Sequence, residues 1–220
     1  MKNLVPILII CLAFNSCQNS ETGKETSKTK TQKTYMEIVN EQLAINSKDN
    51  ATFLDFTLGS TKQEAQKHIS KLIKEKKLKG ESTWDLTFAT IKGYPYQLQL
   101  NDTISCDCAV ADNYFDNKLY TLTAYVFGDC KTKDLISFLT KLYGEPNFEE
   151  IKKEGYSERK KYYWISGNKE VLLTDVASFN AIEFTDLRLK IKDKEFRATI
   201  DTLKTEIGKE KAKETQADFK

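Results

Sequence analysis

Two stretches of the chain place apolar residues at helical spacing between recognisable start and stop signals. The first begins at Thr61, which forms a T-x-x-E capping box with Glu64, or at Ser60 as the alternative cap, and it ends at Gly80. The second begins at Thr132, the predicted N-cap, and stops at Gly144. In the first helix one stripe consists of Ala65, Ile69, Leu72, Ile73 and Lys76. In the second helix the predicted buried stripe consists of Leu135, Ile136, Phe138, Leu139, Leu142 and Tyr143.

Apolar and polar residues alternate elsewhere, which predicts antiparallel strands. One strand, marked by Leu54, Phe56 and Leu58, precedes the first helix. Pro95 places one of the later strands at a sheet edge, or marks its first residues. Four strands are expected between the helices, around 84–88, 94–100, 106–110 and 120–126, and three after the second helix, around 162–164, 171–173 and 182–184.

Two dipeptides fix the expected strand register. Asp116-Asn117 can supply the positive φ of a tight turn, and this turn places position i opposite position 233 − i. Cys106 then faces Phe127, and Cys108 faces Tyr125. Gly167-Asn168 makes a second two-residue turn, which sets Trp164 opposite Val171 and Tyr162 opposite Leu173.

This order of elements predicts an α+β fold, with antiparallel sheet meanders and helices packed on one face. The two helix-then-meander halves suggest a tandem α-β-β-β repeat. A short helix is expected over 35–44, and an amphipathic helix, marked by Phe196, Ile200, Leu203 and Ile207, within 191–220. We assign residues 1–16 to a signal peptide, 17–34 to a lipidated cysteine and its tether, 35–190 to the α+β domain, and 191–220 to the C-terminal helix and charged tail.

The N-terminus predicts export. Lys2 gives a short positive region, and the apolar run from Leu4 to Phe14 is too short to span a bilayer, which needs about 20 residues. The Phe14-Asn15-Ser16-Cys17 segment resembles a bacterial lipobox, which implies that Cys17 is acylated and becomes the mature N-terminus. Ordinary cleavage near Ser16, leaving a soluble secreted protein, is the alternative.

The segment after Cys17 predicts a tether. Residues 18–34 contain no large apolar side chain, so they cannot bury enough surface to offset the entropy of ordering. Gln18 is not the aspartate that commonly retains lipoproteins at the inner membrane. By that resemblance we expect a lipid anchor in the bacterial outer membrane, with the domain facing the periplasm.

Composition narrows the range of partners. The 220 residues are 40% hydrophobic and 30% charged, with 34 Lys+Arg against 32 Asp+Glu and a net charge of +2. Nucleic-acid-binding domains usually carry a basic surplus on one face, so we expect no nucleic-acid partner.

Catalytic groups are sparse. His68 is the only histidine, and it lies beside Lys67 at the border of a helical stripe, where a structural role is expected. The adjacent carboxylates Glu149 and Glu150 are expected to lie in a solvated loop rather than to act as a catalytic acid–base pair. The sequence contains none of the local motifs of zinc proteases, P-loop proteins or serine hydrolases. We therefore predict no catalytic residue, no metal site and no cofactor.

Three cysteines form the most distinctive cluster of the chain: Cys106, Cys108 and Cys130. In an exported protein a disulfide is the default. The expected register brings Cys106 closer to Cys130 than Cys108, so we predict a Cys106–Cys130 bridge at the corner between a strand and the second helix. A three-thiolate metal site and reduced, buried thiols are the alternatives.

Aromatic runs supply candidate binding residues. Tyr94 and Tyr96 flank Pro95, and alternation turns Tyr163 away from Tyr162 and Trp164. These tyrosines could form a glycan or peptide platform, or they could belong to the strand core and its outward face.

Three segments carry a resemblance to a known class: LGSTKQEAQKHI, the helix end LYGEP, and the run YYWISGNKEVLLTD followed by AIEFTD. With them, residues 52–190 resemble BamE/SmpA-type outer-membrane lipoproteins and β-lactamase-inhibitor-like domains. The resemblance implies a binding or scaffolding role. The chain departs from the pattern of these families in two features: the long meander after the first helix, and the three cysteines Cys106, Cys108 and Cys130.

Together these features predict a non-enzymatic, membrane-anchored lipoprotein that binds another envelope protein or supports an envelope assembly. An inhibitor of a secreted enzyme, or a cell-wall glycan-binding module, is the alternative. A hydrolase is the third possibility, although the sequence shows no nucleophile–base pair.

Overall fold

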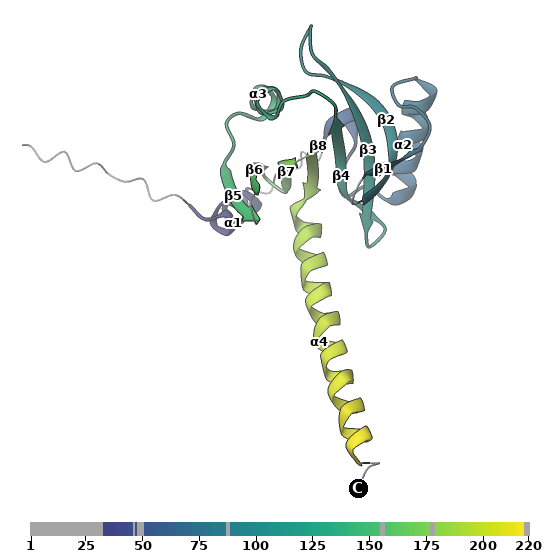
Figure 1. Ribbon diagram of the computed structural model, residues 1–220, viewed down its shortest axis with the longest axis vertical. Helices are drawn as coiled ribbons and strands as arrows, with labels where there is room; N and C mark the ends of the chain where they lie inside the picture. The colour runs from purple at the N-terminus through teal and green to yellow at the C-terminus, as the bar shows by residue number, and fades with distance from the viewer. Residues whose placement is uncertain are drawn as a thin grey trace, which may run out of the picture. The chain divides into compact units, whose positions relative to one another are not determined.

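The computed structural model describes residues 33–45, 47, 51–86, 89–154, 157–176 and 179–217. Within them, eight strands form one antiparallel sheet in the order β1-β2-β3-β4-β8-β7-β6-β5 (Figure 1). The elements in chain order are α1 (Tyr35–Ala44), the 3₁₀ turn η1 (Phe53–Asp55), α2 (Lys62–Lys74), β1 (Ser82–Leu86), β2 (Ala89–Gln99), β3 (Ser105–Phe115), β4 (Lys118–Phe127), α3 (Thr132–Tyr143), β5 (Phe148–Glu154), β6 (Ser157–Ser166), β7 (Lys169–Val176), β8 (Phe179–Asp186) and α4 (Leu187–Ala217).

The sheet consists of two meanders that meet at β4 and β8. The strands β1–β4 follow α2, and β5–β8 follow α3, so each helix precedes four strands. The expectation of three strands after the second helix was wrong, because it omitted β5. The α+β class is confirmed, whereas the tandem repeat stays a prediction.

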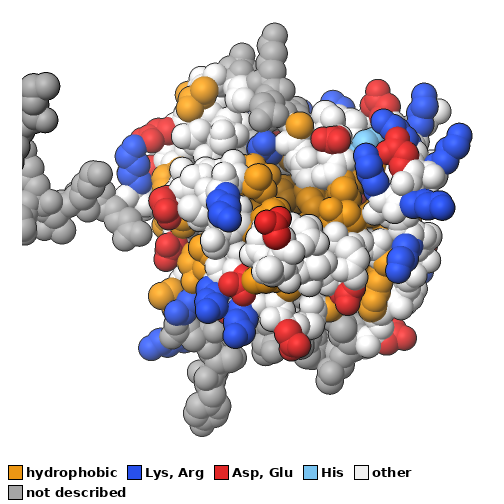
Figure 2. Space-filling view, turned by 90° about the horizontal axis from the view of Figure 1, so that it is seen from above, with side chains coloured by type: hydrophobic (Ala, Val, Ile, Leu, Met, Phe, Trp, Pro, Cys, Tyr) orange, Lys and Arg blue, Asp and Glu red, His pale blue; other side chains and the backbone are white. Residues whose placement is uncertain are grey.

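The α2 and α3 helices pack against one face of the sheet. Three buried residues of α2 and two of α3 join the main core with side chains from β2, β3, β4, β6, β7 and β8. The exposed side of α2 carries lysines, which gather around His68, the pale blue side chain in Figure 2. The helix residues in this core are Ala65, Ile69, Leu72, Leu135 and Leu139.

Helix boundaries follow the sequence signals only in part. The Thr61–Glu64 capping box is present, and α2 ends at Lys74 rather than at Gly80. The N-cap of α3 is Lys131, because the predicted cap, Thr132, is the first helical residue and its hydroxyl donates to Asn180 Oδ1 (3.1 Å). The helix ends before Gly144, which has a positive φ of 80°. Leu142, predicted to be buried, is 57% exposed.

The α1 helix packs on the opposite face, so the prediction that all helices share one face was wrong. Its Ile38 and Val39 form a second, smaller core with Tyr163, Leu172 and other residues of that face. Because side chains alternate along β6, Tyr163 points to this face while Trp164 joins the main core. The helix over 35–44 was predicted correctly and is confirmed.

The strand predicted around Leu54 is a 3₁₀ turn. Leu54 and Asp55 have positive φ values of 57° and 60°, which no strand accommodates. Phe56 and Leu58 are buried as the alternation implied, each 1% exposed. His68 fixes the turn, since its Nε2 lies 2.8 Å from the Leu54 carbonyl oxygen.

A β-bulge shifts the register between β3 and β4. The Asp116-Asn117 turn is confirmed, with φ values of 50° and 58°, and Phe115 pairs with Lys118 as expected. Beyond the bulge at Asn113/Tyr114 the pairing moves by one residue, so Cys108 faces Val126 and the predicted Cys108–Tyr125 pair was wrong. Asp107, and not Cys106, pairs with Phe127. The register of the second hairpin, between β6 and β7, is confirmed.

The α4 helix starts at Leu187, directly after β8, rather than near residue 191. Its predicted apolar stripe remains largely on the surface, with Phe196 57% and Leu203 48% exposed. Phe196 contacts Phe115, with ring centroids 6.1 Å apart. No helix of the described residues is both long enough and apolar enough to cross a membrane.

Candidate binding site at the edge of β2

The β2 strand is longer than its neighbour at the sheet edge. The pairing between β1 and β2 covers Ser82–Leu86 and ends at Gly93. From Tyr94 to Gln99, β2 pairs with β3, and no other strand of the described residues pairs with this stretch. Pro95 therefore lies where β2 is an edge strand, as the sequence indicated.

Main-chain groups of this stretch point away from the sheet. The Pro95 carbonyl oxygen accepts a hydrogen bond from the Lys79 amide (3.1 Å), which lies outside β3. In an antiparallel ladder both main-chain groups of a residue face the same side, and alternate residues face opposite sides. The N–H and C=O groups of Gln97 and Gln99 therefore point outward. We call Tyr94–Gln99 the open edge.

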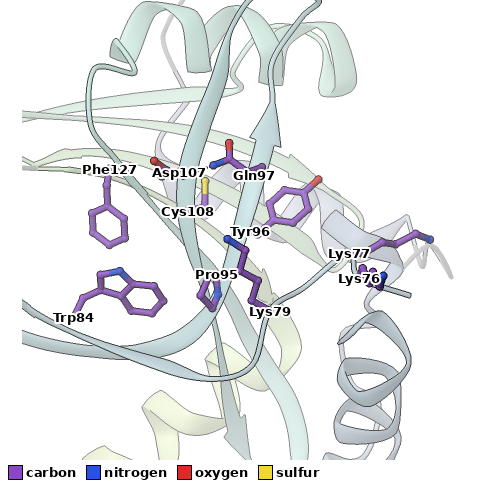
Figure 3. Close-up of a pocket in the computed structure, with 10 residues that line it drawn as sticks. All are labelled: Lys76, Lys77, Lys79, Trp84, Pro95, Tyr96, Gln97, Asp107, Cys108 and Phe127. Atoms are coloured by element: carbon purple, nitrogen blue, oxygen red, sulfur yellow. Dashed lines mark hydrogen bonds between the residues drawn. The ribbon is translucent and has the colours of Figure 1, made fainter. Parts of the chain in front are cut away.

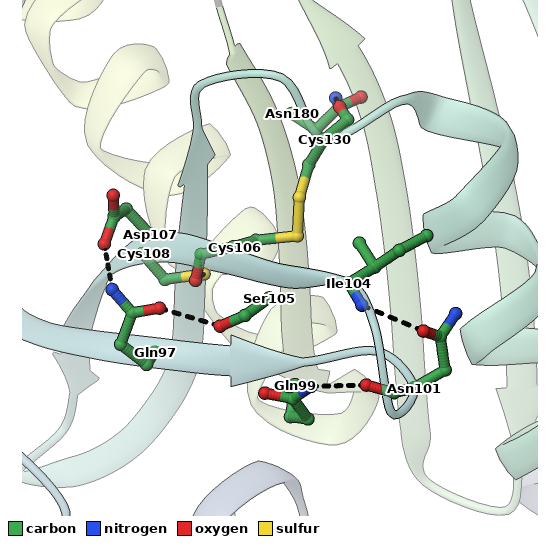
Figure 4. Close-up of a disulfide and its surroundings, with 10 residues drawn as sticks. All are labelled: Gln97, Gln99, Asn101, Ile104, Ser105, Cys106, Asp107, Cys108, Cys130 and Asn180. Atoms are coloured by element: carbon green, nitrogen blue, oxygen red, sulfur yellow. Dashed lines mark hydrogen bonds between the residues drawn. A yellow bond between two sulfur atoms is a disulfide. The ribbon is translucent and has the colours of Figure 1, made fainter.

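Side chains along the open edge are held in place by polar contacts. The Gln97 amide donates to Asp107 and accepts a hydrogen bond from the Ser105 hydroxyl at 2.8 Å (Figure 4). The Gln99 amide donates to the Asn101 carbonyl oxygen. These contacts tie the side chains to β3 and to the following turn, and within the described residues no main-chain hydrogen bond from outside the sheet engages Gln97 or Gln99.

A cavity of about 400 Å³ lies beside the open edge (Figure 3). Trp84 and Phe127 stack with ring centroids 6.0 Å apart, and Tyr96 packs edge-on against Phe53 at 5.0 Å. Burial raises the pKa of the Tyr96 hydroxyl, so this group stays protonated. The lining residues are Lys76, Lys77, Lys79, Trp84, Pro95, Tyr96, Gln97, Asp107, Cys108 and Phe127.

The cavity wall is basic. It holds three lysines and one carboxylate, that of Asp107, which is already bonded to Gln97. Lys77 forms an ion pair with Glu75 at 3.0 Å, and this hydrogen bond raises the pKa of Lys77. Lys76 and Lys79 outnumber the one carboxylate of the lining, so the cavity favours an anionic or carboxylate-bearing ligand.

The predicted disulfide is present at the end of this site. Cys106 is bonded to Cys130, with Cα atoms 6.0 Å apart, and the Cys130 carbonyl accepts from the Asn180 amide at 3.3 Å (Figure 4). The bridge uses two of the three thiols, which rules out the three-thiolate metal site. Cys108 is a free, buried thiol, and burial raises its pKa to about 12. Because the thiolate is the reactive species, Cys108 is a poor nucleophile.

The three tyrosines predicted as binding residues lie in different environments. Tyr96 lines the cavity, whereas Tyr94 is half-buried against the main core. Tyr163 is only 7% exposed, because Tyr35 and Phe148 pack on its ring at 5.3 Å and 5.7 Å. The structure therefore contradicts a platform built on Tyr163.

Trp84 and Phe127 are among the lining residues that the sequence did not predict as part of a site. Trp84 and Phe127 lie on strands more than 40 positions apart, and only the order β1-β2-β3-β4 brings them together. Alternation marked Trp84 as a strand residue, and nothing local paired it with Phe127.

A buried polar cluster lies on the opposite face of the sheet. The Glu170 carboxylate, 1% exposed, accepts from the Tyr35 hydroxyl and from the Lys190 ammonium, each at 2.5 Å. Burial raises the pKa of Tyr35, and Glu170 raises it further. One side chain of β7 thus connects α1 to α4.

Glu183, on the same face of the sheet, makes the stability of the fold depend on pH. Burial raises the pKa of its carboxyl above the ordinary 4.5, Glu170 adds to the rise, and Lys190 and Lys161 oppose it. The folded state therefore holds this proton more tightly than the unfolded state, and this contribution to stability is lost as pH rises through the folded-state pKa. We expect Glu183→Gln to remove this loss of stability at high pH. In urea unfolding, the free energy of unfolding of the variant relative to wild type should therefore be higher at pH 8 than at pH 5.

Glu64 supplies the matched control with the opposite sign. Its hydrogen bonds from the Thr61 backbone and hydroxyl lower the pKa of its carboxyl, so this contribution is lost as pH falls. Glu64→Gln should therefore be less stable than wild type at pH 8, with the difference shrinking in acid. A Glu183→Gln variant with no pH-dependent gain would contradict the assignment.

Comparisons of the chain with protein-family models, curated proteins and solved structures find no match. They therefore give no link to the BamE/SmpA-type or inhibitor-like proteins. The predicted signal peptide, Cys17 and most of the predicted tether lie outside the described residues.

Proposed function

We propose that this protein is a lipid-anchored, non-enzymatic binding module of the bacterial envelope, and that it holds part of another protein at the open edge of β2. The observation that carries the binding role is the open edge itself, with outward main-chain groups beside an aromatic, lysine-rich cavity. Such a surface offers hydrogen bonds and apolar contacts together, which suits recognition of an extended chain.

The groups around the cavity support binding rather than catalysis. Its thiol, Cys108, has a pKa of about 12, and its carboxylate, Asp107, is bonded to Gln97. His68 lies on α2, with its ring nitrogen at the Leu54 carbonyl and its ring edge-on to Phe56 at 4.8 Å. These contacts give His68 a structural role.

The anchor is proposed from the sequence. The apolar run before Cys17 and the polar residues 18–34 match an acylated cysteine followed by a tether. A flexible chain of this length has an end-to-end distance of about 20 to 25 Å, so the domain would be held close to the membrane surface. Placement in the outer membrane, facing the periplasm, follows from the lipobox resemblance and from Gln18.

Substitution of Cys17 tests the anchor. We expect Cys17→Ser to move the protein from the membrane fraction to the soluble fraction and to abolish incorporation of labelled palmitate, because the acylated sulfur is gone. Cys11→Ser is the matched control, since Cys11 lies within the apolar run and should not affect anchoring. Unchanged fractionation and labelling of Cys17→Ser would refute the anchor.

Site-specific photocrosslinking in membranes tests the binding role. A photoreactive phenylalanine in place of Phe127 should form an adduct with a partner, because this ring lines the cavity. The same group in place of Ile151, an exposed residue on the β5 edge (59% exposed), serves as the control. Equal adducts at both positions, or none at Phe127, would contradict a partner site at the open edge.

A further inference from the structure

We infer that the open edge binds its partner by β-strand addition, and that the added strand is a short, acidic segment of another protein. This inference rests on the proposed binding function and specifies the chemistry of the partner. In strand addition, main-chain hydrogen bonds supply affinity, and pockets for alternate side chains supply specificity.

The main-chain geometry determines how much strand fits. Gln97 and Gln99 each present an N–H donor and a C=O acceptor, which gives four potential hydrogen bonds. The amide of Lys79 already occupies the Pro95 carbonyl, and β1 covers β2 up to Gly93. The site therefore accepts a strand of about four or five residues beside Tyr96–Leu100.

The other edges of the sheet contrast with this one. On β5, the segment Phe148–Glu154 has five charged residues in seven, and Lys152 lies 3.5 Å from Glu150. The β1 strand has five residues, including Asp85. Short length and charged side chains are the usual protection of an edge against pairing. The open edge, Tyr94–Gln99, contains no charged residue, so its sequence leaves pairing possible.

The charges and rings that line the cavity indicate which side chains the added strand carries. Lys77 is paired with Glu75, so Lys76 and Lys79 supply the positive charge that exceeds the carboxylate of Asp107, and this surplus favours acidic side chains on the added strand. The rings of Trp84, Tyr96 and Phe127 offer contacts to apolar side chains in the same cavity. A segment that alternates acidic and β-branched residues meets both requirements.

A synthetic peptide tests the inference on the intact protein. The probe is the acetylated, amidated peptide Val-Glu-Val-Glu-Val-Glu with a fluorescent label, and binding is read by anisotropy. We expect saturable binding that weakens with added salt, and binding at least about tenfold weaker when lysine replaces every glutamate. Equal binding of the acidic and basic peptides would overturn the assignment of an acidic partner.

N-methylation of the peptide tests strand addition directly. A methyl group on the amides that face β2 removes donors and blocks the approach, whereas a methyl group on the alternate amides faces away. We expect one methylation register to abolish binding and the other to retain it. Equal effects of the two registers would overturn strand addition, even where the peptide binds.

A pair of protein variants supplies the reciprocal test. Gln97→Pro and Gln97→Ala both lose the contacts to Asp107 and Ser105, and Gln97→Pro alone also loses the outward N–H. We expect Gln97→Pro to bind the acidic peptide at least about tenfold more weakly than Gln97→Ala, because the two variants differ in the outward N–H. Because the methylated peptides use wild-type protein, the inference stays testable even where Gln97→Pro fails to fold.

Two further outcomes separate this inference from the proposed function. Site-specific adducts at Phe127, with no binding of any peptide, would reject strand addition and leave the binding role standing. A concentration-dependent dimer of wild-type protein that Gln97→Pro dissociates would also overturn the inference, because the occupant would then be a second copy of this chain.

Discussion

Removal of the Cys106–Cys130 disulfide is expected to lower the free energy of unfolding by about 3 to 4 kcal/mol. The bridge closes a loop with a sequence separation of 24, and cross-linking a loop of that length removes about this much conformational entropy from the unfolded chain. It also fixes the start of β3 to the residues that precede α3. Equilibrium unfolding of the Cys106→Ser/Cys130→Ser double variant in guanidinium chloride measures the loss.

Two controls separate the bridge from side-chain packing. Wild-type protein with a strong reductant should lose the same amount, because only the S–S bond changes. Cys108→Ala keeps the bridge and should lose about 1 kcal/mol, the cost of removing one buried heavy atom. A wild-type midpoint that is identical with and without reductant would show that the bridge contributes nothing.

The disulfide also shows how far the sequence predicts this fold. The pairing of Cys106 with Cys130 was predicted from a register that was one residue out. The bulge at Asn113/Tyr114 moved Cys108 from Tyr125 to Val126, but this shift changed neither the face of Cys106 nor its position near the corner before α3. Nothing in the sequence marks this bulge.

The sequence correctly predicted several features that depend only on neighbouring residues. The capping box at Thr61 and the turns at Asp116-Asn117 and Gly167-Asn168 depend on residues a few positions apart, and all are present. The β5 strand was missed because Glu149–Glu154 is dominated by charges, which suit an exposed edge strand and hide its alternation.

Contacts between segments that are far apart in the chain could not be predicted from the sequence. Alternation correctly turned Tyr163 away from Trp164, but only the structure shows that α1 covers this side of β6. In the same way, the cavity beside the open edge depends on β1 being shorter than β2 and on the proximity of Trp84 to Phe127. A surface residue on a sheet can be predicted only when the elements that pack on the sheet are known.

The Glu170 cluster gives the second large effect on stability. Glu170→Gln removes a buried charge that accepts hydrogen bonds from Tyr35 on α1 and Lys190 on α4. A neutral amide leaves the ammonium of Lys190 without its counter-charge, and removing one partner of a buried ion pair costs about 3 to 5 kcal/mol. Because the Lys190 side chain is 37% exposed and can reach water, we expect a smaller loss of about 2 kcal/mol in urea unfolding.

The same substitution in an exposed ion pair is the control. Glu41 lies 2.6 Å from Lys33, with side chains 53% and 57% exposed, so Glu41→Gln should change the free energy of unfolding by less than about 0.5 kcal/mol. Hydrogen exchange should also show that Glu170→Gln, and not Glu41→Gln, weakens protection of the α1 amides. Equal effects of the two variants would mean that α1 is held by contacts that do not depend on the carboxylate, such as the burial of Ile38 and Val39 against Tyr163 and Leu172. The difference between the two variants therefore measures how far one buried charge adds to apolar packing in docking α1 on the sheet.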